Sequence, residues 1–276
     1  MRNIKLPALQ NVAPNSHVSL RFPLGVTYEK LYFILGTNIL QSLITNVVLK
    51  LNNKEFQRWA TWADYQAWLS YKGNGSNAGY LVMDFTERLA RDEVAMKFGT
   101  IAACAEAGVQ DFTLEFDLGN YTAVAASTIT AWADVEAPSA NSVIQRVQYN
   151  QKVIGAAATD QMYIPFGANG YQVKRLVVKH TNLTSLRVRR DGVDFYEDLP
   201  IALANARQVD FGRVPQAGYQ VLDFMPDTLQ SNAFNTGFVM VGGKPVPVSN
   251  LDIRATTSAS DTLTYYTESY SLNSQL

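Results

Sequence analysis

The chain has 276 residues, of which 47% are apolar and 17% are charged, and its formal net charge is −1. This length is too great for one small sandwich and suits two domains of about 130 to 140 residues. The near-zero net charge excludes a bulk electrostatic attraction to nucleic acid. The single cysteine, Cys104, excludes an internal disulfide, so stability must come from packing.

Membrane and export signals are absent from the pattern of apolar residues. No apolar run approaches the roughly 20 residues that a membrane-spanning helix needs. The first ten residues, MRNIKLPALQ, lack the apolar stretch of a secretory signal. We therefore expect a mature chain that starts with this sequence and is made in a cytoplasm. A surface poor in charge favours burial in an assembly.

Short segments in which apolar and polar residues alternate follow one another along the first half. In VQDFTLEFD (109–117), three apolar side chains point to one side and acidic or hydroxyl side chains to the other, as in a half-buried strand. The predicted strands cover residues 17–23, 30–36, 46–51, 54–59, 79–85, 94–100, 109–117 and 122–135. Eight strands at regular spacing predict a sandwich or a barrel.

One segment of the first half has helical periodicity instead. In TWADYQAWLSYKG (61–73), the apolar residues at helical spacing are Trp62, Tyr65, Trp68 and Leu69. Thr61 followed by Asp64 resembles a capping box, and Gly73 is a suitable C-cap. We predict a helix of about three turns that closes the open end of a sandwich.

Several marks recur at a separation of 139 residues. The segment GYLVMDFT (79–86) matches GYQVLDFM (218–225). The hairpin dipeptide Asn52-Asn53 likewise corresponds to Asp191-Gly192. The other matching pairs are Gly73 with Gly212, Val109 with Val248 and, after a small register slip, Pro23 with Pro165 and Gly25 with Gly167. The chain is therefore interpreted as a tandem duplication in which Asp84 and Phe85 are equivalent to Asp223 and Phe224.

The repeated layout is two strands, a hairpin pair, a short helix and four strands. It favours an all-β protein made of two tandem eight-stranded jelly rolls, each with a short helix between strands. An immunoglobulin-like sandwich is the rival, but it does not usually carry such a helix. The predicted boundaries are an N-terminal arm (1–16), a first jelly roll (17–136), a linker (137–143) and a second jelly roll (144–276).

The predicted arm mixes basic and apolar residues and is interrupted by two prolines, which prevent a long helix. We expect it to lie outside the first barrel and to contact membrane lipid or a neighbouring subunit. The residues assigned to this contact are Arg2, Ile4, Lys5, Leu6 and Leu9.

No catalytic constellation emerges. A metal-binding double barrel would need several histidines per barrel, whereas this chain has only His17 and His180, on unrelated strands. Cys104 has no partner for nucleophilic catalysis. Asp84 and Asp223 are repeated, but one lies in each half, which indicates a requirement of the fold common to both halves. No catalytic, cofactor-binding or metal-binding residue is assigned, and the chain is expected not to be an enzyme.

One face of the second half is predicted to be basic. Either it is a solvated strand face, or it contacts phosphates of lipid or nucleic acid or an acidic neighbouring subunit. The residues concerned are Lys174, Arg175, Arg187, Arg189 and Arg190.

The N-terminal residues also carry a family resemblance. Asn11-Val12-Ala13, then the run from Ser19 to Gly25 (SLRFPLG), then Thr27-Tyr28-Glu29 resemble the start of the major capsid protein of the corticoviruses. These are tailless icosahedral bacteriophages with an internal membrane.

The resemblance implies a double jelly-roll capsid protein that forms homotrimers of pseudo-hexameric shape. The trimers would assemble into an icosahedral shell around the membrane, with minor capsid and vertex proteins as further partners and no sequence-specific nucleic acid. Structural calcium is associated with the family, but no residue here matches a calcium site. The implied location is the virion, after synthesis in the cytoplasm of a bacterial host.

Two other readings remain open at this point. One is a glycan-active or carbohydrate-binding protein with two β-sandwich domains, since a carboxylate pair cannot be ruled out by sequence. The other is a receptor-binding spike, which the short loops of both halves disfavour.

Overall fold

The computed structural model describes residues 2–74, 80–87, 89–90 and 93–275. The chain divides into two compact units. The first comprises residues 1–148 and 271–276, and the second comprises residues 149–270. Among the described residues, no helix is long and apolar enough to cross a membrane.

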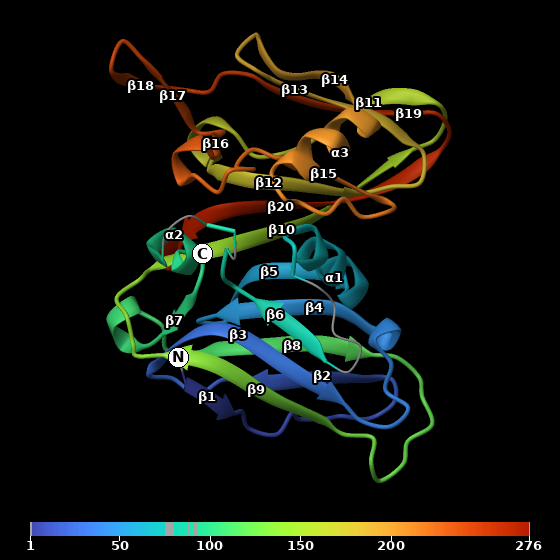
Figure 1. Cartoon of the computed structure of the whole chain (residues 1–276), viewed down its shortest axis with the longest axis vertical. Coiled ribbons are helices and arrows are strands. Elements are labelled where there is room, and N and C mark those ends of the chain that lie inside the picture. Colours follow the sequence, from blue (N-terminus) through green and yellow to red (C-terminus); the bar gives the residue numbers. More distant parts are fainter. Residues whose placement is uncertain (1, 75–79, 88, 91–92, 276) are drawn as a thin grey trace. The chain divides into compact units, whose positions relative to one another are not determined.

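The first unit is built from short strands and two α-helices (Figure 1). Its strands are β1 (Arg2–Lys5), β2 (Ser16–Arg21), β3 (Val26–Leu35), β4 (Ile44–Leu51), β5 (Lys54–Thr61), β6 (Leu81–Asp84), β7 (Ile101–Ala103), β8 (Phe112–Leu118) and β9 (Ile129–Glu136). Its helices are α1 (Trp62–Tyr71) and α2 (Glu93–Lys97), with 3-10 turns η1 (Gln41–Leu43) and η2 (Ala105–Ala107).

Eight of these strands form two four-stranded antiparallel layers. One layer has the order β1-β9-β3-β6, with β7 pairing the start of β3, and the other has the order β2-β8-β4-β5. The strand β10 (Val143–Ile154) begins beside β5, where Val147 pairs in parallel with Gln57. Consecutive strands thus alternate between layers at the start of the unit, as in a jelly roll.

The second unit repeats this order. Its strands after β10 are β11 (Ala158–Met162), β12 (Gln172–Lys179), β13 (Leu183–Arg190), β14 (Val193–Pro200), β15 (Tyr219–Asp223), β16 (Phe234–Asn235), β17 (Phe238–Val241), β18 (Lys244–Pro247), β19 (Leu251–Thr257) and β20 (Asp261–Leu272). Its helix is α3 (Ile201–Asp210), with 3-10 turns η3 (Gly167–Asn169) and η4 (Gln230–Asn232) and, at the end of the chain, η5 (Asn273–Gln275).

The layers of the second unit are β10-β20-β12-β15 and β11-β19-β13-β14. When each strand of the first unit is replaced by its counterpart in chain order, the two units have the same topology. The predicted layout of eight main strands with a helix after the hairpin in each half is therefore confirmed, although in the first unit β1 is one of the eight and α2 is a second helix. The short ribbon β17–β18 is an addition to the second unit.

The two hairpins that suggested the duplication have the same turn. Asn52 and Asn53 have φ values of 50° and 62°, and Asp191 and Gly192 have φ values of 48° and 84°. Two successive residues with positive φ define a type I′ turn, whose twist matches that of the flanking strands. The hairpins β4–β5 and β13–β14 are thus determined locally, by residues that tolerate this backbone conformation.

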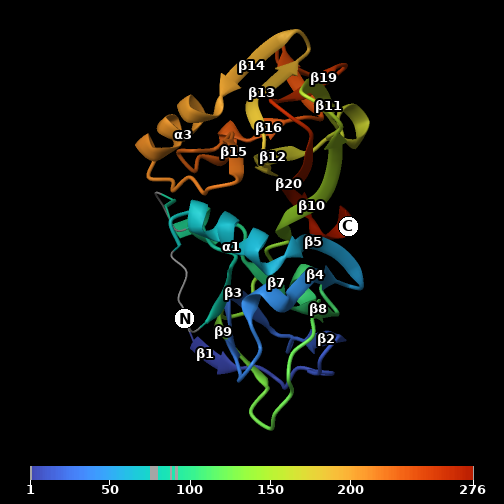
Figure 2. The ribbon, with the colours of Figure 1, turned by 90° about the vertical axis from the view of Figure 1, so that its right-hand side faces the viewer.

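The helices α1 and α3 follow these hairpins and also correspond (Figure 2). Thr61 caps α1, since its side chain accepts a hydrogen bond from the Asp64 amide at 3.2 Å. Both helices end at a glycine with positive φ, Gly73 at 82° and Gly212 at 73°. The predicted cap and C-terminal glycine are confirmed.

Two predicted strands of the first half are wrong in part. Residues 94–100 contain the helix α2 rather than a strand, and Lys97 pairs with Glu93 across one turn at 2.7 Å. In the segment 122–135, the strand β9 begins only at Ile129. The apolar alternation in these segments is short and rich in alanine, so it does not distinguish a strand from a helix or loop.

The predicted N-terminal arm is also wrong. Residues 2–5 form the edge strand β1, which pairs with β9 from Arg2 opposite Val135 to Lys5 opposite Trp132. Leu6 and Leu9 follow at 4% and 9% exposure. Burial of these leucines and the hydrogen bonds of the edge strand incorporate the segment into the first unit, so it does not lie outside the barrel.

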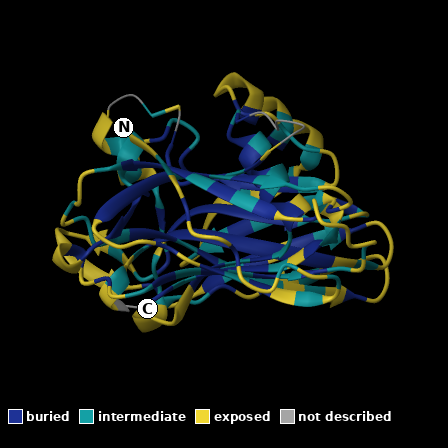
Figure 3. Cartoon of the chain, turned by 90° about the horizontal axis from the view of Figure 1, so that it is seen from below, coloured by how far each residue is buried: buried dark blue, intermediate teal, exposed yellow. Residues whose placement is uncertain are grey.

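Each unit has an apolar interior between its layers. In Figure 3 the strands are largely buried, whereas the connecting segments are exposed. In the strand β8 buried and half-buried residues alternate from Phe112 to Leu118, with Phe112, Leu114 and Phe116 buried as the period of two predicts. The core of the second unit includes Val173, Leu176, Val178, Leu186, Val188, Ile253 and Leu263.

Candidate functional site

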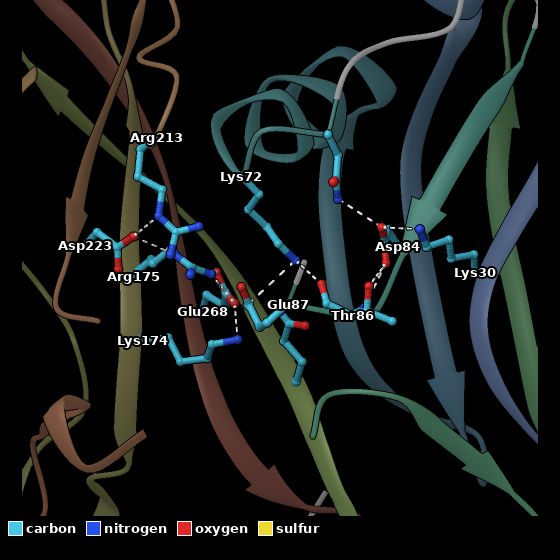
Figure 4. Close-up of polar contacts among 12 residues, drawn as sticks. Lys30, Lys72, Asp84, Thr86, Glu87, Lys174, Arg175, Arg213, Asp223 and Glu268 are labelled. Carbon is cyan, nitrogen blue, oxygen red and sulfur yellow. Dashed lines mark hydrogen bonds and ion pairs between the residues drawn. The ribbon is translucent and has the colours of Figure 1, made fainter. Parts of the chain in front are cut away.

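The repeated carboxylate of the first unit, Asp84, lies at the end of β6 and is 2% exposed. It pairs with Lys30 Nζ at 3.2 Å and accepts a hydrogen bond from Asn74 Nδ2 at 2.9 Å. Thr86 donates to it from its amide at 2.9 Å and from its hydroxyl at 2.6 Å (Figure 4). The carboxylate thus joins β3, the segment after α1 and the chain that leaves β6.

Asp223, at the end of β15, has the corresponding partners in the second unit. Arg175 Nε donates to its Oδ2 at 3.0 Å, and Arg213 Nε lies 3.3 Å from the same oxygen (Figure 4). The amide of Met225 donates to Oδ1 at 3.0 Å. Two guanidinium groups therefore replace the ammonium and amide groups that hold Asp84.

Strand pairing shows that the two sites are equivalent. Lys30 stands opposite Asp84, and Arg175 stands opposite Asp223. The partner strands are β3 and β12. The register of β3 with β9 shifts at Glu29, directly before Lys30, and the register of β12 with β20 shifts at Lys174, directly before Arg175.

The residue at each irregularity accepts a backbone hydrogen bond of 3.0 Å. The Phe85 amide donates to the carbonyl of Glu29, and the Phe224 amide donates to that of Lys174. The predicted equivalence of Asp84 with Asp223 and of Phe85 with Phe224 is confirmed. The first residue of the repeated segment, Gly79, lies outside the described residues.

The arrangement is suited to holding the fold and not to catalysis. Each carboxylate accepts several hydrogen bonds from its own unit, which is what a buried charge requires to be tolerated. One carboxylate lies in each unit, at the same structural position. The interpretation that their repetition reflects a requirement of the fold is therefore supported by their contacts.

Two of the predicted basic contact residues are used inside the second unit. Lys174 and Arg175 are buried, and Glu268 lies 2.8 Å from Lys174 Nζ and 3.1 Å from Arg175 Nη1. The assignment of these two residues to external phosphates or a neighbouring subunit is wrong. The strand β12 is a central strand with both faces covered. The positions of polar residues along it therefore do not indicate which side chains are exposed.

The other three basic residues lie near the hairpin β13–β14. Arg187 pairs with Asp194 at 3.2 Å, and this hydrogen bond raises the pKa of Arg187. Arg190 lies over the rings of Phe195 and Phe234, at 4.6 Å and 4.8 Å from their centres. Burial lowers the pKa of Arg190.

Arg189 differs from these two because 41% of its side chain is exposed. It therefore remains a candidate for contact with another molecule.

Among the predicted N-terminal contact residues, exposure separates two groups. Arg2 and Lys5 are exposed, and Lys5 Nζ lies 5.7 Å from the centre of the Trp132 ring. Ile4 is half-buried, and Leu6 and Leu9 are buried. The apolar members therefore serve the first unit, and the two cations face outward.

Sequence reasoning missed two cationic groups of the first unit, one buried at Lys72 and one half-buried at Lys97. Lys72 Nζ donates to the Thr86 carbonyl at 2.9 Å, lies 3.6 Å from Glu87 and is 4.3 Å from the centre of the Trp68 ring. Its place in the last turn of the predicted helix was the available signal, but a lysine at a helix C-terminus is usually exposed.

The second group centres on Lys97. Its Nζ lies 2.6 Å from Glu136 and 3.7 Å from Glu29. Burial, and then the nearby charge of Glu136, raise the pKa of Glu29. The hydrogen bond from Lys97 lowers the pKa of Glu136.

No assignment of a metal or nucleophile follows from the geometry. Within the described ranges, no three His, Cys, Asp or Glu side chains are grouped so as to hold a metal ion. We therefore assign no residues to calcium. Cys104 is buried, and its thiol donates to the Ser139 carbonyl at 3.2 Å.

Family models match both halves of the chain in order. Residues 3–136 match the viral coat protein P2 N-terminal domain, and residues 144–273 match the viral coat protein P2 C-terminal domain. The chain belongs to the viral coat protein P2 family. The resemblance noted in its N-terminal residues is confirmed, and this P2-family chain is a structural coat protein rather than an enzyme.

Solved capsid proteins share the fold of this P2-family chain. The major capsid protein P2 from bacteriophage PM2 matches with a TM-score of 0.84 at 16% identity, over 98% of this chain and 97% of that one. A chain in the structure of Sulfolobus turreted icosahedral virus matches with a TM-score of 0.67 at 14% identity, over 98% of this chain and 90% of that one. The PBCV-1 virus capsid matches with a TM-score of 0.61 at 11% identity, over 98% of this chain and 92% of that one.

These matches confirm the predicted double jelly-roll fold. No curated protein sequence matches the chain.

Proposed function

We propose that this coat protein is the major capsid protein of an icosahedral virus with an internal membrane, and that it acts as a homotrimer. The observation that carries the proposal is the presence of two jelly rolls of the same topology in one chain. Three such chains can place six similar barrels around one axis, which gives a pseudo-hexameric unit that tiles a shell. We further propose that the boundary between the halves lies in residues 137–143 and that the protein is located in the virion.

The oligomeric state tests the first step. Analytical ultracentrifugation of the purified chain at micromolar concentration and physiological salt should give about three times the monomer mass, because obligate interfaces of about 2,000–5,000 Å² do not dissociate under these conditions. A monodisperse monomer would contradict the proposal. The shell itself is tested by electron microscopy of particles formed by this protein.

Lipid contact is a separate part of the proposal. Arg2 and Lys5 are the exposed cations of β1, and each basic residue near an anionic bilayer contributes about 1 kcal/mol. Two are too few to hold one chain, but many copies in a shell act together.

The double variant Arg2→Gln/Lys5→Gln leaves Leu6 and Leu9 in place, so it tests charge without unfolding the first unit. It should form normal trimers yet bind less to vesicles that contain anionic lipid. If the double variant binds these vesicles as strongly as the wild type does, anionic lipid is not the partner of Arg2 and Lys5. Of the five basic residues predicted for the second half, Arg189 is then the exposed candidate for contact with a neighbouring subunit, a minor capsid protein or a vertex protein.

A further inference from the structure

Two arginines of the second unit have guanidinium nitrogens that no protein group uses. Arg190 ends β13, and its Nη1 donates to the Asn235 carbonyl at 2.7 Å, whereas its Nε and Nη2 donate to no residue that the structure describes. The buried side-chain atoms without a hydrogen bond do not include these two nitrogens, so both are open to solvent. Arg207 of α3 is exposed and forms no hydrogen bond or ion pair with any described residue.

Both arginines line one hollow of about 320 Å³. The aromatic members of its lining are Phe195, Tyr196, Phe224 and Phe234. Among the described residues, no aspartate or glutamate lines it. Its volume is at the lower end of the range found for small-molecule sites. The hollow thus combines positive charge with aromatic walls.

Comparison with the first unit shows that the fold does not require these cations. The hairpins and the helices of the two units correspond at a separation of 139 residues, so the counterpart of Arg190 is Leu51 and that of Arg207 is Trp68. Both counterparts are 1% exposed. Since one unit folds with buried apolar residues at these positions, two cations in the other unit indicate a role besides packing.

The rings of the hollow, by contrast, are common to both units. Phe195 and Phe224 correspond to Phe56 and Phe85, which are each 1% exposed. In the second unit, 43% of Phe195 is exposed, and Phe224 is half-buried. Ring surface that is packed inside the first unit is therefore open to a ligand in the second.

The surroundings of Arg190 favour the arrival of an anion. Its guanidinium lies 4.6 Å and 4.8 Å from the centres of two phenylalanine rings. Burial lowers the pKa of Arg190, because loss of water penalises its charged form. The nearby charge of Asp191 offsets this only in part, and its Oδ1 already accepts hydrogen bonds from Ser249 and Asn250.

We propose that this hollow binds a small organic carboxylate, whose charged group pairs with Arg190 and Arg207 and whose apolar body lies against the aromatic walls. The planar fork of a guanidinium matches the two oxygens of a carboxylate, and such charge-assisted hydrogen bonds are strong. The inference goes beyond the proposed function and does not depend on it, because every lining residue belongs to the second unit of one chain.

The charge beside Arg207 favours a carboxylate over a phosphate ester. Asp227 and Arg207 both line the adjoining hollow of about 430 Å³. The carboxylate of Asp227 accepts from the Leu229 amide at 3.2 Å and from Asn232 Nδ2 at 3.0 Å, and it forms no ion pair with Arg207. This negative group repels a doubly charged phosphate more strongly than a singly charged carboxylate.

The required chemistry is tested with small probes on the full-length protein. A ligand-detected NMR titration should show that benzoate binds and that benzamide, which has the same ring without the charge, binds about tenfold more weakly. Phenyl phosphate should bind more weakly than benzoate. Added salt should weaken the binding of benzoate and not that of benzamide, because ions screen exposed charges.

Variants of Arg207 test whether the probes bind at this hollow. Arg207→Gln changes an exposed side chain, so the fold is retained, and it should weaken benzoate binding about tenfold while leaving benzamide binding unchanged. Arg207→Lys keeps the charge without the planar fork and should restore part of the affinity. The matched control, Arg254→Gln, removes an exposed cation of the same unit outside the lining and should bind benzoate as the wild type does.

Arg190→Gln tests the half-buried cation and should cause the same loss of benzoate binding. Arg207→Gln decides the test if Arg190→Gln does not fold. The site is overturned if benzoate does not bind the wild type, if benzamide binds equally well, or if Arg207→Gln binds benzoate as strongly as the wild type does. Tighter binding of phenyl phosphate than of benzoate would overturn the choice of a carboxylate.

Discussion

At the scale of single residues, the same structural task is done by different donors in the two units. Asp84 is held by Lys30, whose side chain is 28% exposed, whereas Asp223 is held by Arg175 and Arg213, which are both buried. Water can partly solvate Lys30 when its partner is lost. Water cannot solvate the buried guanidinium groups in this way, although Arg175 keeps Glu268 as a partner, so the second unit depends more strongly on its aspartate.

Neutralising each aspartate should reveal this difference. We expect Asp223→Asn to lower the free energy of unfolding of its unit by about 3–5 kcal/mol, the usual cost of breaking a buried ion pair. Asp84→Asn should cost about 1–3 kcal/mol, because hydrogen bonds to a charged group are lost but Lys30 is partly solvated.

The four tryptophans, Trp59, Trp62, Trp68 and Trp132, all lie in the first unit, so fluorescence follows that unit during urea unfolding. Circular dichroism follows both units. The exposed Asp210→Asn, at the end of α3, is the control. Equal losses for Asp84→Asn and Asp223→Asn would contradict the argument from burial.

A second residue-scale prediction concerns His17. Its ring nitrogen Nδ1 lies 2.7 Å from Asp117, and this hydrogen bond raises the pKa of His17, with a contribution from the charge of Glu115. The stabilisation by protonated His17 is therefore complete below pH 6.5 or so and is lost as the pH rises through the raised pKa.

NMR titration should find His17 titrating above His180, whose pKa is lowered by burial. Asp117→Asn should move the pKa of His17 downward and leave that of His180 in place. A pKa of His17 that does not respond to Asp117→Asn would show that the contact is not maintained in solution.

At the scale of elements, the edge strand β1 is the clearest example of a segment whose role depends on its partner. It has four residues, and its pairing with β9 spans more than 120 positions of sequence. The two leucines that follow are buried in the same unit. An isolated edge strand of this length has little stability of its own, so burial of Leu6 and Leu9 must supply part of what holds it.

Truncating one of these leucines tests the role of β1. Leu6→Ala should lower the stability of the first unit by about 2–5 kcal/mol, as other buried leucines do. Tryptophan fluorescence during urea unfolding measures this loss. Leu24→Ala, at a side chain that is 44% exposed, is the matched control and should change stability by less than about 0.5 kcal/mol. A flexible arm would instead tolerate Leu6→Ala as well as it tolerates Leu24→Ala.

At the scale of the whole molecule, residues from the far end of the chain complete the first unit. Asn273 donates from its amide to the Ser142 carbonyl at 2.9 Å, and from its side chain to the Ala107 carbonyl. Residues 271–276 group with residues 1–148 for this reason. The two halves of the sequence are therefore not the same as the two compact units.

This division predicts that a change at the end of the chain weakens the first unit. Asn273→Ala removes a hydrogen bond to a part-buried carbonyl and should cost about 0.5–1.5 kcal/mol, read from the fluorescence midpoint of the tryptophans. Ser271→Ala is the control, since its hydroxyl donates to the neighbouring Leu272 carbonyl. A shift with Ser271→Ala equal to that with Asn273→Ala would mean that the contacts of Asn273 do not matter.

Features that depend on neighbouring residues could be predicted from the sequence alone. Asn52-Asn53 and Asp191-Gly192 form type I′ turns because these residues tolerate positive φ, and Thr61 caps α1 because its hydroxyl is next to free amides. The repetition of such local signals revealed the duplication and therefore the fold. It also identified Asp84 and Asp223 as important, although not their partners.

Features that depend on residues far apart in the chain became visible in the folded structure. Whether a cation is exposed or buried is set by carboxylates far away, as with Arg175, which Glu268 and Asp223 neutralise from 93 and 48 positions along the chain. The edge strand β1 exists because β9 presents unpaired backbone groups to it. The second unit also has a hollow of about 430 Å³ lined in part by Ala204, the counterpart of Tyr65, and empty volume of this kind is a property of packing and not of any single residue.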